Sequence, residues 1–82
     1  MNNKKKINLI FMKTVFSKAL NLKNFNLKNN FKYENVPNWD SLGHMKIISE
    51  LESRMKIEFD IDEIIGKDTV QKLIEMVNKK LK

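Results

Sequence analysis

The stretch that decides the fold reads Asn38-Trp39-Asp40-Ser41-Leu42-Gly43-His44-Met45. Just before it, Pro37 fixes its own φ and disfavours helical geometry at Val36, so no helix runs into the stretch from upstream. Asp40 is a residue type that accepts the first free amide protons of a helix, which predicts Asp40 as the N-cap and Ser41 as the first helical residue. An anion attached to a hydroxyl there would be stabilised by the positive end of the helix dipole.

The residues that follow divide into two groups on a helical wheel. One group has the spacing of a core-facing stripe and comprises His44, Ile47, Ile48, Leu51 and Met55. Leu42 and Met45 fall outside this stripe, beside Ser41. An Asp-Ser pair alone does no more than begin a helix, but apolar residues that the core does not need indicate a docking surface around an attachment point.

From Trp39 to Phe59 the chain reads WDSLGHMKIISELESRMKIEF. This run resembles the Asp-Ser-Leu motif and second helix of acyl carrier proteins, especially stand-alone carriers outside fatty-acid synthesis. The resemblance extends from Pro37 to Leu81 and is weak before that. It implies an all-α, acyl-carrier-like four-helix bundle of three main helices and one short helix, with a long loop between the first and second helices.

The resemblance also implies a function. In this family a phosphopantetheinyl transferase moves phosphopantetheine from coenzyme A onto the motif serine, matched here by Ser41, and the terminal thiol of that arm carries acyl groups as thioesters. Asp40 and Leu42 complete the implied attachment motif, and an acyl-loading ligase or acyltransferase is the second implied partner. Two alternatives stay open: an aminoacyl or peptidyl carrier, and a small interaction domain that never receives an arm.

Partner enzymes are expected to bind the second helix and its surroundings. Besides Leu42, the expected docking residues are Met45, Glu50, Glu52 and Asp62. Lys46 and Arg54 depart from the strongly acidic second helix of the housekeeping fatty-acid carriers. We therefore expect a specialised pathway rather than general fatty-acid synthesis.

Composition bounds the chemistry of the 82-residue chain. We expect a flexible basic N-terminus at 1–6 and a single carrier domain at 7–82. The chain has no cysteine, so thioester chemistry needs a thiol brought by a cofactor. No paired carboxylates, glycine-rich phosphate loop or metal-spaced cluster occurs, so we predict neither an enzyme with catalytic residues nor a metal site. His44, the only histidine, lies at the edge of the core stripe and is interpreted as structural.

The net charge of +6 is unusual for this family, whose members are mostly acidic, and a basic small domain ordinarily suggests nucleic acid. The charge is unevenly distributed. Residues 1–33 hold eight lysines and no acid, residues 34–68 hold nine acids against four basic residues, and residues 69–82 have a net charge of +3. The segment around Ser41 is therefore acidic, and because the signatures of common nucleic-acid modules are missing, no nucleic-acid partner is predicted.

Periodicity predicts a first helix with one broad apolar face formed by Leu9, Met12, Val15, Phe16, Ala19 and Leu20. Its lysines are interpreted as a solvated face, with a membrane-surface helix as the alternative. The apolar run from Ile7 to Met12 is shorter than a signal core or a membrane span. We therefore expect a cytoplasmic, monomeric protein without stable membrane insertion.

The remaining segments are predicted from residues that favour loops and helix ends and from short apolar patterns. Residues 22–38 form a long loop whose apolar side chains are expected to cover the core: Leu22, Phe25, Leu27, Phe31 and Tyr33. After Met55, a left-handed Lys56 would cost about 1 kcal/mol relative to glycine, so we expect the second helix to end differently from its relatives.

Two further helices are expected before the C-terminus. The short third helix should pack on one side through Phe59, Ile61, Ile64 and Ile65, with Gly66 as terminator. Asp68 or Thr69 should cap the last helix. The apolar face of that helix comprises Val70, Leu73, Ile74, Val77 and Leu81.

Overall fold

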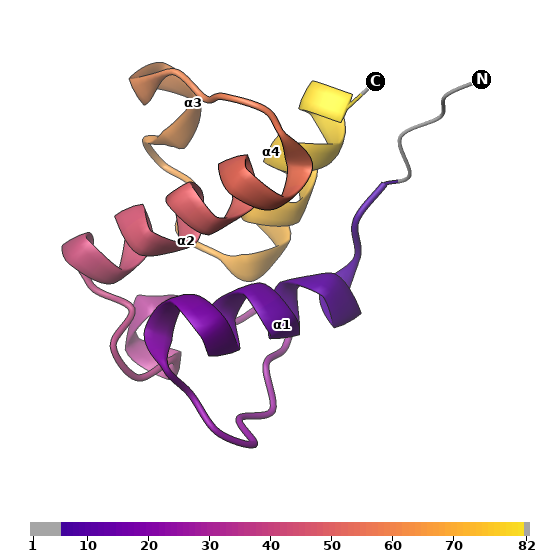
Figure 1. Cartoon of the computed structure of the whole chain (residues 1–82). Helices are drawn as coiled ribbons and strands as arrows, with labels where there is room; N and C mark the ends of the chain where they lie inside the picture. Colours follow the sequence, from indigo (N-terminus) through magenta and orange to yellow (C-terminus); the bar gives the residue numbers. More distant parts are fainter. Residues whose placement is uncertain (1–5, 82) are drawn as a thin grey trace.

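The computed structural model describes residues 6–81, which form four α-helices and one short 3-10 helix (Figure 1). In chain order the elements are α1 Leu9–Leu20, η1 Tyr33–Asn35, α2 Ser41–Met55, α3 Ile61–Ile64 and α4 Val70–Leu81. The described residues contain no β-sheet, since the strand-like pairing among them is an isolated antiparallel bridge between Lys32 and Thr69. The predicted all-α four-helix bundle with a long first loop is confirmed.

Helix α1 begins and ends at residues suited to capping. The side chain of Asn8 accepts a hydrogen bond from the Phe11 amide at 3.1 Å, and Asn21 ends the helix in the left-handed conformation. The residues that α1 buries are Met12, Val15, Phe16 and Leu20, with Leu9 and Ala19 partly buried. The apolar face predicted for this helix is confirmed.

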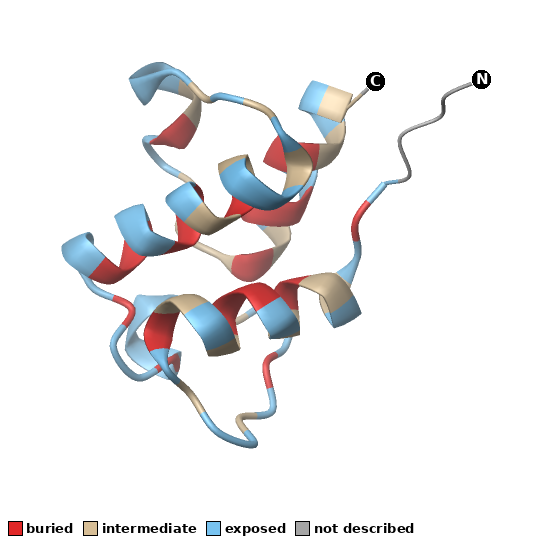
Figure 2. Ribbon diagram, in the orientation of Figure 1, coloured by how far each residue is buried: buried red, intermediate tan, exposed pale blue. Residues whose placement is uncertain are grey.

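Helix α2 lies beside α1, and the buried sides of the two helices face each other (Figures 1 and 2). Its stripe residues Ile47, Ile48 and Leu51 are at most 1% exposed, and Met55 is partly buried against the same core. Burying such aliphatic side chains is the main favourable term in folding a domain of this size, about 1.5–3 kcal/mol each. The predicted helical phase is therefore confirmed.

The end of α2 differs from what we expected. Lys56 adopts the left-handed conformation at φ 56° and ψ 51°, and its amide donates a hydrogen bond to the carbonyl of Glu52. That hydrogen bond satisfies a carbonyl of the last turn, which offsets the roughly 1 kcal/mol that a side chain costs in this conformation. A lysine thus ends the helix in the geometry that usually favours glycine.

The long loop between α1 and α2 covers one end of the core. Its buried or partly buried apolar residues are Leu22, Phe25, Leu27, Phe31, Val36 and Trp39. Tyr33 also covers the core, as predicted, although it is 41% exposed: its ring lies edge-on against the Trp39 ring at 4.9 Å between centroids. It therefore covers Trp39 from outside and is not itself a core residue.

The same loop is tied to the start of α4 by main-chain hydrogen bonds. The amide of Val70 donates to the Phe31 carbonyl at 3.1 Å, and the amide of Gln71 donates to the Asn29 carbonyl at 2.9 Å. Thr69 is the side-chain cap, its hydroxyl oxygen accepting the Lys72 amide at 3.1 Å. The first-turn amides of Val70 and Gln71 are thus satisfied from the loop, and that of Lys72 by Thr69. Helix α4 buries Val70, Leu73, Ile74, Met76 and Val77, with Leu81 partly buried.

Helix α3 has a single turn, and this shortness corrects one prediction. Ile64 is buried and Phe59, just before the helix, is partly buried, but Ile61 is 62% and Ile65 66% exposed. A helix of one turn directs only one of its side chains, Ile64, fully toward the core. Ile61 and Ile65 therefore remain mostly exposed. Gly66 follows at φ 83°, a left-handed conformation that glycine adopts without strain.

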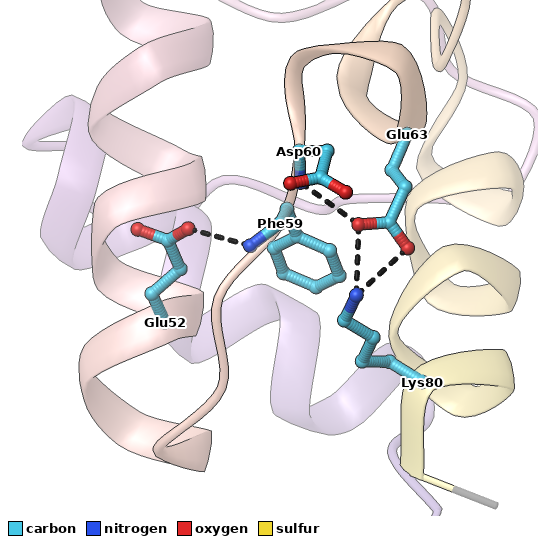
Figure 3. Close-up of polar contacts among 5 residues, drawn as sticks. All are labelled: Glu52, Phe59, Asp60, Glu63 and Lys80. Carbon is cyan, nitrogen blue, oxygen red and sulfur yellow. Dashed lines mark hydrogen bonds and ion pairs between the residues drawn. The ribbon is translucent and has the colours of Figure 1, made fainter.

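Polar contacts hold α3 between α2 and α4 (Figure 3). A carboxylate oxygen of Glu52 accepts the Phe59 amide at 2.9 Å, and Glu63 accepts the Asp60 amide at 2.8 Å. The ammonium of Lys80 donates to both carboxylate oxygens of Glu63, at 2.8 and 2.9 Å, and lies 5.7 Å from the centre of the Phe59 ring. The Lys80 hydrogen bond is the main reason why the pKa of Glu63 is lowered.

The chain ahead of α1 joins α4 through an amide side chain. Asn78 accepts the Ile7 amide at 2.7 Å and donates to the Ile7 carbonyl at 3.1 Å, and Ile7 itself is buried. The flexible basic N-terminus predicted at 1–6 lies, apart from Lys6, outside the described residues, and the single domain at 7–82 stays a prediction. Within residues 6–81, no helix has the length and apolar character needed to cross a membrane.

Candidate functional site

Ser41 is the first residue of α2, and its side chain is exposed. The preceding Asp40 is the N-cap, with a carboxylate oxygen 2.8 Å from the Gly43 amide nitrogen that donates to it. The Asp40 carbonyl accepts the His44 amide at 2.7 Å, which closes the first turn. The predicted roles of Asp40 as cap and Ser41 as first helical residue are confirmed. The hydroxyl therefore stands at the positive end of the helix dipole, open to solvent.

Gly43 allows the loop before α2 to approach the helix closely. A Cβ at this position would lie 2.1 Å from the Asn38 carbonyl oxygen and 2.9 Å from a methyl carbon of Leu20. Asn38 has a left-handed φ of 67°, and its side-chain nitrogen Nδ2 donates to the Leu20 carbonyl at 3.0 Å. The end of α1 and the start of α2 are thereby joined through Asn38, which fixes the backbone around Ser41.

A buried aromatic pair supports the same turn from the core side. The indole nitrogen of Trp39 donates a hydrogen bond to Nδ1 of His44 at 3.0 Å, and the two side chains are 3% and 7% exposed. Their rings are nearly parallel, while Tyr33 lies edge-on to His44 at 5.6 Å between centroids. Because Nδ1 accepts, the neutral ring carries its proton on Nε2. His44 is a satisfied structural histidine, as predicted.

Burial lowers the pKa of His44 below its ordinary value of 6.5, although a backbone hydrogen bond with Ile64 opposes this shift. Removing the ring from water disfavours the charged form, which explains the direction. The hydrogen bond from Trp39 to His44 connects the loop to α2. The neutral ring is part of the architecture beneath the serine.

The exposed apolar residues stand next to Ser41, as predicted. Leu42 is 66% exposed and Met45 is 44% exposed. Both line a hollow of about 450 Å³ between α1 and α2, together with Lys18 and Lys46. Neither side chain is required by the core, so both are free to contact another molecule.

The three acidic residues predicted for docking are not gathered at one place. Glu50 lines the same hollow as Leu42 and pairs with Arg54, whose Nε lies 2.6 Å from its carboxylate. Glu52 faces the segment before α3, where it accepts the Phe59 amide. Asp62 is exposed on α3. The structure thus places Glu50 beside the apolar docking residues Leu42 and Met45. Glu52 instead fixes the segment before α3 to α2.

Sequence reasoning did not assign roles to Asn38 and Gly43 at this site. A glycine within the first turn of a helix is a signal of close backbone approach, and asparagine is the residue that most readily adopts a left-handed φ after glycine. Neither signal names the contacting partner, which here is the end of α1. As to metals, residues 6–81 contain no group of three or more His, Cys, Asp or Glu side chains that could hold an ion.

Comparison with known proteins places this geometry in a family. No protein-family model matches the chain, and no curated protein matches it. Among solved structures, the chain is similar to the solution NMR structure of holo acyl carrier protein from Geobacter metallireducens, with a TM-score of 0.80 and 30% sequence identity. The alignment covers 89% of this chain and 84% of that one. The chain therefore belongs to the acyl carrier protein family.

Proposed function

We propose that Ser41 carries phosphopantetheine and that the chain transports acyl groups on this arm. Membership of the family makes the chain a carrier protein. The observation that supports the attachment point is the exposed hydroxyl of Ser41 on the first turn of α2, beside exposed Leu42 and Met45. The similar Geobacter protein is described as the holo form, and an attached arm is what that term implies in this family.

The residues around Ser41 fit a phosphodiester-linked arm. Its phosphate would lie at the positive end of the α2 dipole, which stabilises an anion by about 0.3–1 kcal/mol at an exposed position. The Asp40 carboxylate is turned to the Gly43 amide, 2.8 Å away. When attached, the arm supplies the thiol that this cysteine-free chain lacks and on which acyl groups form thioesters.

Attachment exchanges the phosphoanhydride bond of coenzyme A for a phosphodiester bond to the serine. The Ser41 oxygen bonds to the phosphorus that bears the pantetheine group of coenzyme A, the bond from that phosphorus to adenosine 3′,5′-bisphosphate breaks, and the serine proton leaves to base. A phosphopantetheinyl transferase supplies the catalytic groups for this step. We infer that the chain is a substrate of that enzyme and of an acyl-loading ligase or acyltransferase, and is not an enzyme itself.

We further propose that the pathway is specialised. Lys46 is exposed on α2 and lines the hollow next to Leu42 and Met45, so it adds positive charge at the docking surface. A partner with a basic docking face would meet like charge there, which opposes association. Arg54 contributes less than the sequence suggests, because its guanidinium is paired with Glu50. The support therefore rests mainly on Lys46.

The experiment is to incubate the purified chain with coenzyme A, Mg²⁺ and a broad-specificity phosphopantetheinyl transferase and to record intact masses. Wild type and Ser49→Ala should each gain one phosphopantetheine, because Ser49 is also exposed on α2 but is not at its start. Ser41→Ala should gain nothing. Absence of the adduct on folded wild type, or its persistence in Ser41→Ala, would contradict the proposal. The same mass measurement without coenzyme A is the control for simple phosphorylation, because a phosphate found on the chain there cannot come from phosphopantetheine transfer.

A further inference from the structure

A groove runs along the exposed seam between α1 and α2. At one end, a hollow is lined by Leu20 from the end of α1 and Gly43 from the start of α2. The central hollow, of about 450 Å³, lies between Ala19 and Met45. At the other end, a third hollow reaches Lys13 and Arg54. Neighbouring hollows share lining residues, namely Lys18, Ala19, Leu42 and Lys46, so the three form one groove. Along this groove the residue numbers fall on α1 as they rise on α2.

The rim of this groove is positively charged. Lys13, Lys18 and Lys46 line it, and within residues 6–81 none of these lysines lies at ion-pair distance from a carboxylate. The two carboxylates on the groove already have partners, since Asp40 accepts the Gly43 amide and Glu50 pairs with Arg54. Three cationic groups that line this groove are therefore available to a ligand.

The groove also has an apolar part, and this part decides between classes of ligand. Leu42 is 66% and Met45 44% exposed, and Ala19 lies opposite them on α1. None of the lining residues is aromatic, whereas single-stranded nucleic acids are usually held by stacking on aromatic rings. Apolar side chains flanked by lysines complement a protein segment whose apolar residues are flanked by carboxylates.

The length of the groove indicates the shape of that segment. The part of α2 from Leu42 to Arg54 rises about 18 Å at 1.5 Å per residue, which matches a partner helix of about three to four turns. We propose that the α1–α2 groove seats an acidic amphipathic helix of a partner enzyme, its carboxylates meeting Lys13, Lys18 and Lys46 and its apolar face meeting Leu42 and Met45. This inference rests on the proposed function, because a partner seated there would face the arm on Ser41.

The test uses two synthetic helical peptides of about four turns, identical in their leucine face. One carries glutamates beside the leucines, and the other carries lysines at the same positions. Fluorescence anisotropy with the full chain should detect the acidic peptide, with affinity falling as salt rises. Lys18→Glu/Lys46→Glu should weaken binding by about tenfold or more. The control Lys28→Glu/Lys79→Glu changes the charge equally at exposed positions outside the groove and should weaken binding less than about threefold.

Several outcomes would overturn the groove proposal: equal or tighter binding of the lysine peptide, no binding of the acidic peptide, or equal losses in the two double variants. Tighter binding of a single-stranded oligonucleotide through the same lysines would replace it with a nucleic-acid site. Modification of Ser41 is scored separately by mass. A chain that gains the arm but does not bind the acidic peptide refutes the groove alone, and one that binds the peptide but never gains the arm refutes the proposed function alone.

Discussion

The indole nitrogen of Trp39 donates a hydrogen bond to Nδ1 of His44 over 3.0 Å, and both side chains are buried beside the first turn of α2. A proton on that Nδ1 would place two donors against each other, so the contact requires neutral histidine. Trp39 and His44 flank the Asp40–Ser41 pair in the sequence. Their contact therefore makes the support beneath the candidate attachment site sensitive to protonation.

This contact predicts how stability depends on pH. Burial lowers the pKa of folded His44 below 6.5, so in mildly acidic solution the unfolded chain binds more protons than the folded chain. The contribution of His44 should be fully present above pH 6.5 and should decrease as the pH falls below it. Urea unfolding followed through the fluorescence of Trp39, the single tryptophan, measures this dependence.

The control is His44→Gln, which removes the titrating ring but keeps an acceptor for Trp39. Its free energy of unfolding should be nearly independent of pH in the same window. Glu63 and Asp68 do not interfere, because hydrogen bonds from Lys80 and Lys72 lower their pKa values below 4.5 and 3.8. Their contributions are lost only in more acidic solution. Equal slopes for wild type and His44→Gln would refute the assigned role.

Substitutions in α2 should separate core residues from docking residues. Leu51→Ala should lower the free energy of unfolding by about 2–5 kcal/mol, because Leu51 is 0% exposed and its loss leaves a cavity. Leu42→Ala should cost about 0.5 kcal/mol or less, since Leu42 is mostly exposed, while slowing modification by the transferase. Chemical denaturation and adduct kinetics measure the two effects. Similar destabilisation by both substitutions would contradict the helical phase.

Gly43→Ala tests the close approach of the loop to α2. The added methyl group would meet the Asn38 carbonyl oxygen at 2.1 Å, a backbone atom that cannot move alone. We expect a loss of about 1–3 kcal/mol in unfolding free energy, as is typical of overpacking. Ser49→Ala is the matched control, because Ser49 is exposed in the same helix, and it should cost about 0.5 kcal/mol or less. A Gly43→Ala chain as stable as wild type would show that the contact is not restrictive.

The charge on α2 predicts which loading enzymes use this carrier poorly. After attachment of the arm, Lys46→Glu should increase malonyl loading by a general fatty-acid transacylase about three- to tenfold at low salt, and the gain should shrink as salt rises. Arg54→Glu should add less, since Arg54 is already paired with Glu50. Lys79→Glu on α4 serves as the control for net charge. Equal loading of all the proteins would mean that Lys46 does not select partners.

The parts of the structure that follow from local chemistry were predictable from the sequence. Asp40 caps α2 by accepting a hydrogen bond from the amide three residues further along the chain. The buried stripe from His44 to Leu51 follows from helical spacing alone. Thr69 was one of two candidate caps for the same reason. In each case the determining contact lies within one or two helical turns, so the sequence contains both partners.

The parts that depend on distant contacts were not predictable. The close approach at Gly43 needs the end of α1, and the hydrogen bond of Glu52 needs the segment before α3. Lys56 keeps a left-handed conformation because its amide then donates a hydrogen bond to the Glu52 carbonyl in the last turn of α2. Ile61 and Ile65 are exposed because α3 is a single turn, too short for a periodic pattern to define a buried face. Contacts outside the helix therefore decided Gly43 and Glu52, whereas Lys56, Ile61 and Ile65 follow from how α2 ends and how short α3 is, two local features that residue types alone do not fix.

The most direct measurement for the central claim is an intact-mass analysis after incubation with octanoyl coenzyme A, Mg²⁺ and a broad-specificity phosphopantetheinyl transferase. The wild-type chain should gain one octanoyl-phosphopantetheine, and hydroxylamine should then remove the octanoyl group while leaving the arm, because the acyl link is a thioester. Fragmentation should assign the arm to Ser41, and Ser41→Ala should remain unmodified. A folded wild-type chain that gains no mass, or an adduct located at any residue other than Ser41, would contradict the account.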